Sequence, residues 1–370
     1  MKKVLVTIVM LVLTIAVTHA QDAAPRITYF IAEDTNGIDQ VYQLSLDGQS
    51  EPRQITQAEN DVINFGAAYD GLGIAYISDG ELVIQSVHSD SSEVVAPISA
   101  TQFFSGPVFS PDGQYLAYPD NGVWIMDLST RDTELVLENV SLEEAASNAT
   151  EYRVYAPELF VLDENGMADK LIVDVGVWEW NTVGVYDLQT GEFQELEGQR
   201  HTDLLPLADG RVLLYGNNGM AGDPTLDIAE NLDDINSSTE LVDFSMLIEN
   251  GILFATDAVE IEPGVVRILG PHVRFGQEST GEIAMYFDYD INAGEIVNTN
   301  IVTMASDDEF PSAQTWTLSP DGSIVPVYNV PLWTDAGSIY GEFMLIDLNT
   351  SEVLSAQFPE IVSIFRWQPA

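Results

Sequence analysis

The residues best suited to binding a ligand are acidic clusters between the apolar runs of the chain. NLDDIN contains Asp233 and Asp234, and SDDEFP contains Asp307, Asp308 and Glu309. Carboxylate oxygens are hard ligands that suit Ca²⁺, although neither run has the full EF-hand spacing. Ca²⁺ at Asp233 and Asp234, or at Asp307 and Asp308, is therefore the cofactor hypothesis. A solvated acidic loop without a cofactor is the alternative.

Three tryptophans also fall between predicted strands. Trp178 and Trp180 occur in VWEWNT, and Trp333 occupies the corresponding connection near the C-terminus. Exposed aromatic rings stack on sugars and anchor peptides, whereas packing against neighbouring strands is the alternative. The predicted binding face consists of Trp178, Trp180, Trp333, Asp307, Asp308 and Glu309.

No catalytic residues are nominated by the sequence. There is no G-x-S-x-G motif, so a hydrolase elbow is not indicated. His88, His201 and His272 do not lie within metal-ligand spacing of one another. Carboxylates are abundant enough that a glycosidase pair stays open as an alternative.

Charge is the most unusual property of the chain. The chain has 12 Lys and Arg against 59 Asp and Glu, a formal net charge of −47. Such a field repels nucleic acids and anionic membranes, so neither is expected as a partner. A surface adapted to a saline medium is one explanation, and binding of cations or basic partners is the other. The absence of cysteine excludes disulfides and thiolate metal sites.

The first 20 residues have the layout of a secretory signal peptide. Lys2 and Lys3 precede an apolar stretch from Val4 to Val17, and small residues end at Ala20. Because this stretch is shorter than the roughly 20 residues that span a bilayer, we expect cleavage rather than anchoring. We predict a signal peptide over 1–20 and a single domain over 21–370. The mature protein is then secreted, periplasmic or extracellular, monomeric and not inserted in a membrane.

Asp-Gly or Asn-Gly pairs recur between apolar runs. These residue types tolerate the positive φ angles of a tight hairpin turn. The pairs begin at Asp70, Asp112, Asn165, Asp209, Asn250 and Asp321. Most steps are about 40 to 50 residues, the length of a β-propeller blade, and the longer last step indicates an insertion. The sequence therefore predicts an all-β, seven-bladed β-propeller of four-stranded antiparallel blades, with six or eight blades as alternatives.

A second turn motif appears as VWIMDLSTRD, VGVYDLQTGE and FMLIDLNTSE. Alignment of these strings places Asp127, Asp187 and Asp347 at one position. An aspartate side chain readily accepts hydrogen bonds from the backbone just downstream of it. We expect these aspartates to cap turns rather than perform chemistry.

The strings SPDGQYLAY and VWIMDL resemble the WD-repeat-like blades of the TolB-type β-propeller family. The resemblance is clearest from Ser110 to Leu128 and from Ser319 to Leu348, and it implies a propeller for most of the chain. It implies no particular activity, because such blades serve many roles. TolB proteins carry a separate domain before the propeller, whereas here the first strand is expected to begin by Ile27.

The two ends of the chain predict how the ring closes. The first repeat, from Ile27, lacks the strand that should precede its turn. The C-terminal Trp367-Gln368-Pro369 resembles Phe109-Ser110-Pro111 of that missing strand type. We therefore expect the C-terminal strand to complete the N-terminal blade.

Three classes of function are compatible with these features. The first is a secreted, non-catalytic binding module that uses the long-loop face to bind a protein, peptide or glycan. The second is a glycan-active or other hydrolytic propeller enzyme, and the third is a structural component of an envelope or cell surface. Because loops on a rigid scaffold concentrate binding residues, we favour the first.

The charge generates a prediction about salt. Removing Lys2 and Lys3 leaves 10 basic residues against 59 acidic ones, so residues 21–370 carry a formal charge of −49. Self-repulsion opposes the folded state, and NaCl screens it as the Debye length falls from about 10 Å at 0.1 M to about 3 Å at 1 M. The melting temperature should therefore rise over that range. A flat or falling melting temperature would show that local pairing or bound ions already neutralise the charge.

Overall fold

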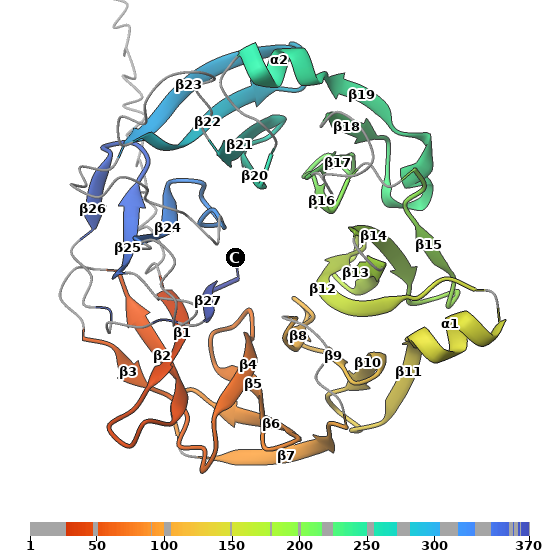
Figure 1. Cartoon of the computed structure of the whole chain (residues 1–370), viewed down its shortest axis with the longest axis vertical. Helices are drawn as coiled ribbons and strands as arrows, with labels where there is room; N and C mark the ends of the chain where they lie inside the picture. The colour runs from red at the N-terminus through yellow and green to blue at the C-terminus, as the bar shows by residue number, and fades with distance from the viewer. Residues whose placement is uncertain are drawn as a thin grey trace, which may run out of the picture.

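The structure is a computed structural model in which the described chain forms a ring of seven antiparallel sheets around a central axis (Figure 1). The described residues are 27–46, 51–89, 91–99, 105–148, 150–177, 180–198, 201–216, 225–249, 255–271, 282–303, 317–329, 342–354, 358, 362 and 364–369. The predicted all-β, seven-bladed β-propeller is confirmed, and the alternatives of six and eight blades are wrong.

We number the blades in chain order. Blade 1 contains β27 (Ile364–Trp367), β1 (Ile27–Glu33), β2 (Asp39–Ser45) and β3 (Arg53–Gln54). Blade 2 contains β4 (Val62–Ala67), β5 (Gly73–Ser78), β6 (Glu81–Ser86) and β7 (Ser92–Pro97). Blade 3 contains β8 (Val108–Phe109), β9 (Tyr115–Pro119), β10 (Gly122–Asp127) and β11 (Thr133–Glu138). Blade 4 contains β12 (Val154–Leu162), β13 (Ala168–Val177), β14 (Trp180–Asp187) and β15 (Phe193–Glu195).

The remaining blades follow the same meander. Blade 5 contains β16 (Asp203–Pro206), β17 (Val212–Tyr215), β18 (Leu226–Ala229) and β19 (Thr239–Val242), with the 3-10 helix η1 (Leu232–Ser237) before β19. Blade 6 contains β20 (Asp257–Glu262), β21 (Val265–Pro271), β22 (Glu282–Asp290) and β23 (Glu295–Thr303). The described part of blade 7 contains β24 (Ile324–Asn329), β25 (Glu342–Asp347) and β26 (Glu352–Leu354). Helices α1 (Leu142–Asn148) and α2 (Phe244–Glu249) lie at the outer edge of the ring (Figure 1).

Strand direction gives the ring two distinct faces. Because neighbouring strands are antiparallel, the first and third turns of each blade emerge on one face, which we call the short-turn face. The second connection and the link to the next blade emerge on the other, which we call the long-connection face. Each innermost strand therefore begins at the long-connection face.

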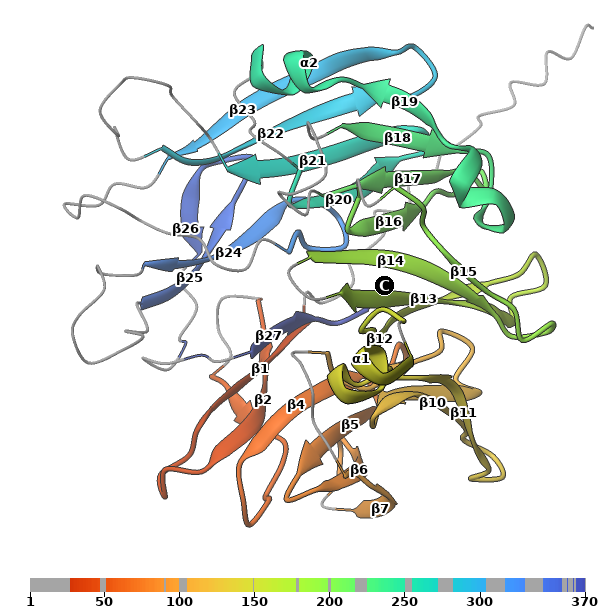
Figure 2. The ribbon, with the colours of Figure 1, turned by 45° about the vertical axis from the view of Figure 1, so that its right-hand side comes forward.

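The closing strand pairs as predicted. Strand β27 lies on the side of β1 nearer the centre of the ring (Figure 1), and the two strands are also neighbours in the turned view (Figure 2). Their antiparallel register pairs Thr28 with Trp367 and Ile31 with Ile364. Beyond the strand, the Gln368 backbone amide donates to the Ile27 carbonyl oxygen at 3.0 Å. The last strand of the chain thus completes the first blade.

The hydrophobic core lies between adjacent blades. Tyr29 and Ile31 of blade 1 pack in one cluster with Phe65 and Ile74 of blade 2. Equivalent clusters join blades 4 and 5 and blades 5 and 6. Because inner strands are covered on both faces, runs such as KLIVDV read as nearly continuous apolar sequence rather than strict alternation.

The aligned aspartates cap turns as expected. Asp127 Oδ1 accepts backbone hydrogen bonds from Ser129 and Thr130 at 2.8 and 2.9 Å. The side chains of Asp187 and Asp347 accept equivalent bonds from the second and third residues after them. These bonds satisfy backbone donors that the tight turn leaves without strand partners.

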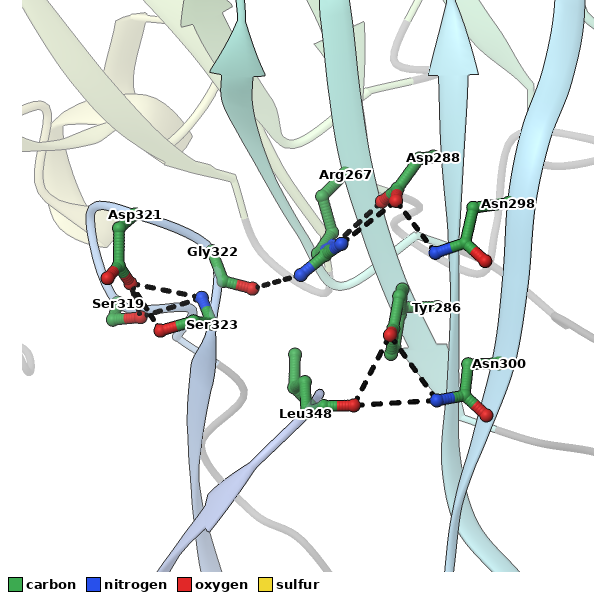
Figure 3. Close-up of polar contacts among 10 residues, drawn as sticks. All are labelled: Arg267, Tyr286, Asp288, Asn298, Asn300, Ser319, Asp321, Gly322, Ser323 and Leu348. Carbon is green, nitrogen blue, oxygen red and sulfur yellow. Dashed lines mark hydrogen bonds and ion pairs between the residues drawn. The ribbon is translucent and has the colours of Figure 1, made fainter. Parts of the chain in front are cut away.

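Polar contacts join blades 6 and 7 (Figure 3). Arg267 donates two hydrogen bonds to Asp288 at 2.7 and 2.8 Å and a third to the Gly322 carbonyl oxygen at 2.7 Å. The Tyr286 hydroxyl donates to the Leu348 carbonyl oxygen at 3.3 Å. Arg267 and Asp288 are both buried, and their mutual pairing offsets the cost of removing two charges from water.

The start of blade 6 differs from the sequence-based prediction. Residues expected to form its first strand form helix α2, because Asp243 accepts a hydrogen bond from the Met246 amide at 2.8 Å and caps a helical turn. The Asn250-Gly251 pair lies outside the described residues. The first hairpin of this blade turns instead at Gly264, whose φ is +79°. This turn is a Pro263-Gly264 pair, which the pattern of Asp-Gly and Asn-Gly pairs does not include. Once the turn is placed at Gly264, the long step to Asp321 no longer requires an insertion.

The connections between the second and third strands differ in length from blade to blade. Blades 2 and 3 turn tightly at Asp79-Gly80 and at Asn121-Gly122, with positive φ angles at all four positions. In blade 4, Val177 pairs directly with Trp180, so the connection in which Trp178 and Trp180 were expected is a short hairpin. The longer second connections therefore belong to blades 5, 6 and 7.

Ring closure generates a second prediction. Deletion of residues 360–370 removes β27 and exposes the inner edge of β1, which leaves unpaired backbone groups. The truncated protein should melt at a lower temperature and self-associate in analytical ultracentrifugation. A truncated protein that stays monomeric and melts at the wild-type temperature would contradict the closure.

Candidate functional site

A cavity of about 360 Å³ lies beside the innermost strands of blades 1, 3 and 4. Its lining residues are Ser105, Gly106, Val108, Val154, Ala156, Pro157, Glu158, Asp174, Gly176, Asn181 and Arg366. Val154 and Gly106 precede or begin innermost strands, and Gly176 and Asn181 pair at the end of the β13–β14 hairpin. The cavity therefore lies toward the long-connection face.

Glu158 reaches the cavity because of a β-bulge. The register of β12 against β13 shifts between Pro157 and Leu159, so Glu158 has no direct partner in the ladder. A bulge of this kind redirects a side chain, and Glu158 lines the cavity at this position. Its Oε2 atom is buried without a hydrogen-bond partner. Burial, together with the nearby carboxylates led by Asp174, raises the pKa of Glu158 well above its ordinary value.

Asp174 lies on the neighbouring strand β13 and lines the same cavity. Burial and the charge of Asp203 raise the pKa of Asp174 to about 7. At neutral pH this carboxyl is therefore partly protonated, whereas an ordinary surface aspartate is ionised. Two carboxyl groups with raised pKa values therefore line one cavity.

Arg366 contributes the only guanidinium among the lining residues. It lies on the closing strand β27, and its Nη2 atom donates to Asn64 Oδ1 at 3.1 Å. Its Nε atom is buried without an acceptor. Burial lowers the pKa of Arg366, because the charged form loses its hydration.

Two further carboxyls occupy the first positions of innermost strands. Asp203 begins β16 and Asp257 begins β20. Asp257 accepts hydrogen bonds from the Tyr215 hydroxyl at 3.3 Å and from the Leu318 amide, which links blades 5, 6 and 7. Burial raises the pKa of Asp257 to about 7 despite the opposing bond from Leu318, and burial also raises the pKa of Asp203.

His201 lies just before β16 and is almost completely buried. Its Nε2 atom lies 3.1 Å from Asp227 Oδ2 on β18, and its Nδ1 atom is buried without a hydrogen-bond partner. The backbone carbonyl oxygen of His201 also accepts a hydrogen bond from the Thr182 hydroxyl at 3.3 Å. This histidine is a core residue close to the carboxyl groups of Asp227 and Asp203.

The sequence-based predictions did not include Asp203 and Asp257, although a repeat in the chain marks both. TDLLPLADGRVLLYG and TDAVEIEPGVVRILG each begin with Thr-Asp ahead of an innermost strand. In both, the threonine amide donates to the backbone of the second strand, at 3.1 Å for Thr202 and 2.8 Å for Thr256. Glu158 has no comparable signal, because the bulge depends on strand pairing.

Most residues of the predicted binding face lie outside the described residues. These are Trp178, Trp333, Asp307, Asp308 and Glu309. Trp180 is the first residue of β14 and directly precedes Asn181 of the cavity, and nothing further is described of its side chain. The predicted face as a whole stays a prediction.

The first predicted Ca²⁺ pair lies in η1. Asp233 accepts a hydrogen bond from the Lys170 ammonium at 2.7 Å, and Lys170 also contacts Asp187 at 2.9 Å. Burial alone would lower the pKa of Lys170, but these bonds from Asp233 and Asp187 raise it overall. Asp234 also lies within η1, but its backbone angles are not helical (φ −141°, ψ 56°). Within the described part of the chain, no group of three or more His, Asp or Glu residues is arranged to hold a metal ion. Ca²⁺ binding at either pair stays a prediction.

Comparisons with known proteins identify the fold rather than an activity. No family model matches the chain. The uncharacterized protein YidR of Escherichia coli K12 is 32% identical over 101 residues, which are 26% of this chain and 24% of YidR. The chain therefore aligns with only about a quarter of that relative.

Solved propeller structures resemble most of the chain. An oligogalacturonate lyase in complex with manganese has a TM-score of 0.52 and 12% identity, covering 90% of this chain and 84% of that one. The oligogalacturonate lyase of Vibrio parahaemolyticus has a TM-score of 0.53 and 11% identity, covering 88% and 83%. TolB from Acinetobacter baumannii has a TM-score of 0.43 and 14% identity, covering 75% of this chain and 63% of TolB. At these identities the likeness to the two lyases establishes a shared propeller fold alone. Among the described helices, none has the length and apolar character needed to cross a bilayer.

The raised pKa of Asp174 generates a prediction about stability. Folded Asp174 keeps its proton to about pH 7, whereas an unfolded aspartate loses it near pH 3.9. Wild-type stability should therefore fall as the pH rises from about 4 to about 7, and Asp174→Asn should remove that part of the loss. The variant should match wild type near pH 4 and unfold at higher urea at pH 8, with a gain of about 1.4 kcal/mol for each unit of pKa difference.

Asp127→Asn provides the control for this measurement. Hydrogen bonds led by the Ser129 side chain lower the pKa of Asp127, so its stabilising contribution is present at neutral pH and is lost as the pH falls. This variant should be destabilised at pH 8 and approach wild type in acid. An Asp174→Asn variant that is no more stable than wild type at pH 8 would contradict the raised pKa.

Proposed function

We propose that this protein is an exported, non-catalytic binding module that holds a polar group of its ligand in the cavity beside Glu158 and Arg366. The observation that carries the proposal is a pair of buried polar atoms that have no hydrogen-bond partner among the described residues and belong to two residues lining one cavity. Glu158 Oε2 and Arg366 Nε are both buried without hydrogen-bond partners, and both residues line the cavity. Buried polar atoms without partners cost free energy, which a bound ligand recovers.

The location of the cavity supports the same proposal. It lies toward the long-connection face, where the longer connections of blades 5, 6 and 7 also emerge. Its volume falls within the roughly 300–1,000 Å³ that is typical of small-molecule sites. The rest of a peptide or glycan ligand would then extend over that face.

The finer assignments rest on the sequence. The repeated SPDG turns support a TolB-type propeller, and the N-terminal residues 1–20 support export to a secreted or periplasmic location. The formal charge of −47 supports a partner other than nucleic acid. A structural role at the envelope would use the same propeller but would not require a ligand in the cavity.

Catalysis is the second candidate function, and one observation favours it. Burial raises the pKa of Asp174 to about 7, and a carboxyl that holds a proton near neutral pH is suited to general acid or base catalysis. The propeller neighbours that act as oligogalacturonate lyases add only a shared fold.

The proposed function predicts that blocking the cavity abolishes binding. Asn181 is exposed at the rim of the cavity, so Asn181→Trp should fill its mouth without disturbing the core. We suggest thermal-shift assays with a panel of small anionic, neutral and cationic compounds. A ligand at 100 times its Kd should stabilise wild type by about 2.7 kcal/mol and should leave Asn181→Trp unchanged.

Asn165→Trp, at an exposed turn on the short-turn face, is the matched control and should respond like wild type. A panel in which no compound stabilises wild type, or stabilises Asn181→Trp equally, would contradict the proposal. Chemical conversion of a bound compound by wild type but not by Glu158→Gln would favour the catalytic candidate instead.

A further inference from the structure

Arg366 is a partly buried cation with a buried Nε atom, and it has no carboxylate partner among the described residues of this strongly acidic protein. The chain has a formal net charge of −47, yet no carboxylate among the described residues lies within ion-pair distance of this guanidinium. Four other arginines do pair with carboxylates, namely Arg131, Arg153, Arg211 and Arg267. Because the described surroundings of this guanidinium supply no carboxylate, an anionic group of a ligand can pair with it.

The surroundings of Arg366 hold its guanidinium in place. Nη2 donates to Asn64 Oδ1, and the Cζ atom lies 5.8 Å from the centre of the Phe65 ring. A Cβ atom at Gly106 would lie 2.5 Å from Asn64 Oδ1 and 3.0 Å from Arg366 Nη2. Glycine at position 106 therefore makes room for the pair of Asn64 and Arg366 at the cavity wall.

The rest of the cavity restricts which anion fits. A guanidinium presents a planar fork that matches a carboxylate in two parallel hydrogen bonds. Glu158 and Asp174 line the same cavity, and their negative forms would repel a second charge on the ligand. Their protonated forms can donate hydrogen bonds to a hydroxyl or carbonyl oxygen. These conditions favour a monoanion over a phosphate dianion.

We propose that the cavity binds a small monocarboxylate, with its carboxylate against Arg366 and its polar groups near Glu158 and Asp174. The proposal deepens the proposed function and rests on it, since it names the ligand class of that cavity. The carboxylate is supplied by a free organic acid or by an acidic sugar.

Binding of such an anion is linked to proton uptake. The ionisable groups that act on Glu158 are Asp174 on β13, Asp203 on β16 and Asp257 on β20, and Arg366 lines the cavity from β27. Burial raises the pKa of Asp174 to about 7, so an anion should bind best below that pH. Affinity should fall by up to about tenfold for each pH unit above 7, because binding then requires one proton.

NMR spectroscopy of the full chain labelled with [15N]arginine tests the proposal. The Nε–H resonance of Arg366 is assigned by its loss in Arg366→Gln. Three probes with one ring and different charge are titrated at pH 6 and pH 8: D-glucuronate, D-glucose and D-glucosamine. Glucuronate should shift the resonance saturably, more tightly at pH 6, and the other two should not.

Variants separate the anchor from its surroundings. Arg366→Gln should lose glucuronate binding, measured by calorimetry, while Arg131→Gln, with the same charge change at a surface ion pair, should bind like wild type. If Arg366→Gln does not fold, Glu158→Gln and Asp174→Asn decide, because both should bind glucuronate with a weaker pH dependence than wild type.

Two results would overturn the inference, and they differ. Saturable binding of glucosamine or glucose, but not glucuronate, would refute the carboxylate and leave the cavity as a binding site. Binding of none of the three probes at either pH would contradict both the inference and the proposed function.

Discussion

The pairing of β27 with β1 is the contact on which the rest of the ring depends. Residues 364–367 meet residues 28–31 in an antiparallel register, so the two ends of the chain form one sheet. Without this pairing, blade 1 would lack its innermost strand and the ring would have two open edges. The closure also places Arg366 beside the cavity, because that residue lies on the closing strand.

Burial determines the electrostatics around the axis. Burial within the blades raises the pKa values of Glu158, Asp174, Asp203 and Asp257. The exposed turn aspartates behave in the opposite way. Hydrogen bonds led by the Thr190 amide lower the pKa of Asp187 to about 2. Aspartate therefore has two roles here: ionised side chains cap exposed turns, and buried side chains have raised pKa values.

The sequence was sufficient for the repeating parts of the fold. Turn chemistry at Asp112-Gly113 and capping by Asp127 depend on a few adjacent residues, so these features were predictable. The chain ends were predictable because Trp367-Gln368-Pro369 repeats a strand already present at Phe109. Helix α2 was not predicted, because the cap at Asp243 competed with an apolar sequence that reads equally well as strand.

The candidate site was less accessible to sequence reasoning. Glu158 reaches the cavity through a bulge that exists only once β12 pairs with β13, and Arg366 reaches it only once the ring closes. Neither placement is encoded in a short motif. The tryptophans and acidic runs were selected because they fall between predicted strands in the sequence. The cavity residues, in contrast, are brought together by long-range strand pairing and by burial.

Ring closure places Arg366 at a cavity lined by Glu158 and Asp174, two residues whose pKa values burial raises. The most direct test is a carboxyl 13C NMR titration of aspartate-labelled protein, with the Asp174 resonance assigned by its loss in Asp174→Asn. We predict a midpoint near pH 7 for Asp174, where burial and Asp203 place its pKa. A midpoint near pH 4, the value of an exposed aspartate, would contradict this effect of burial.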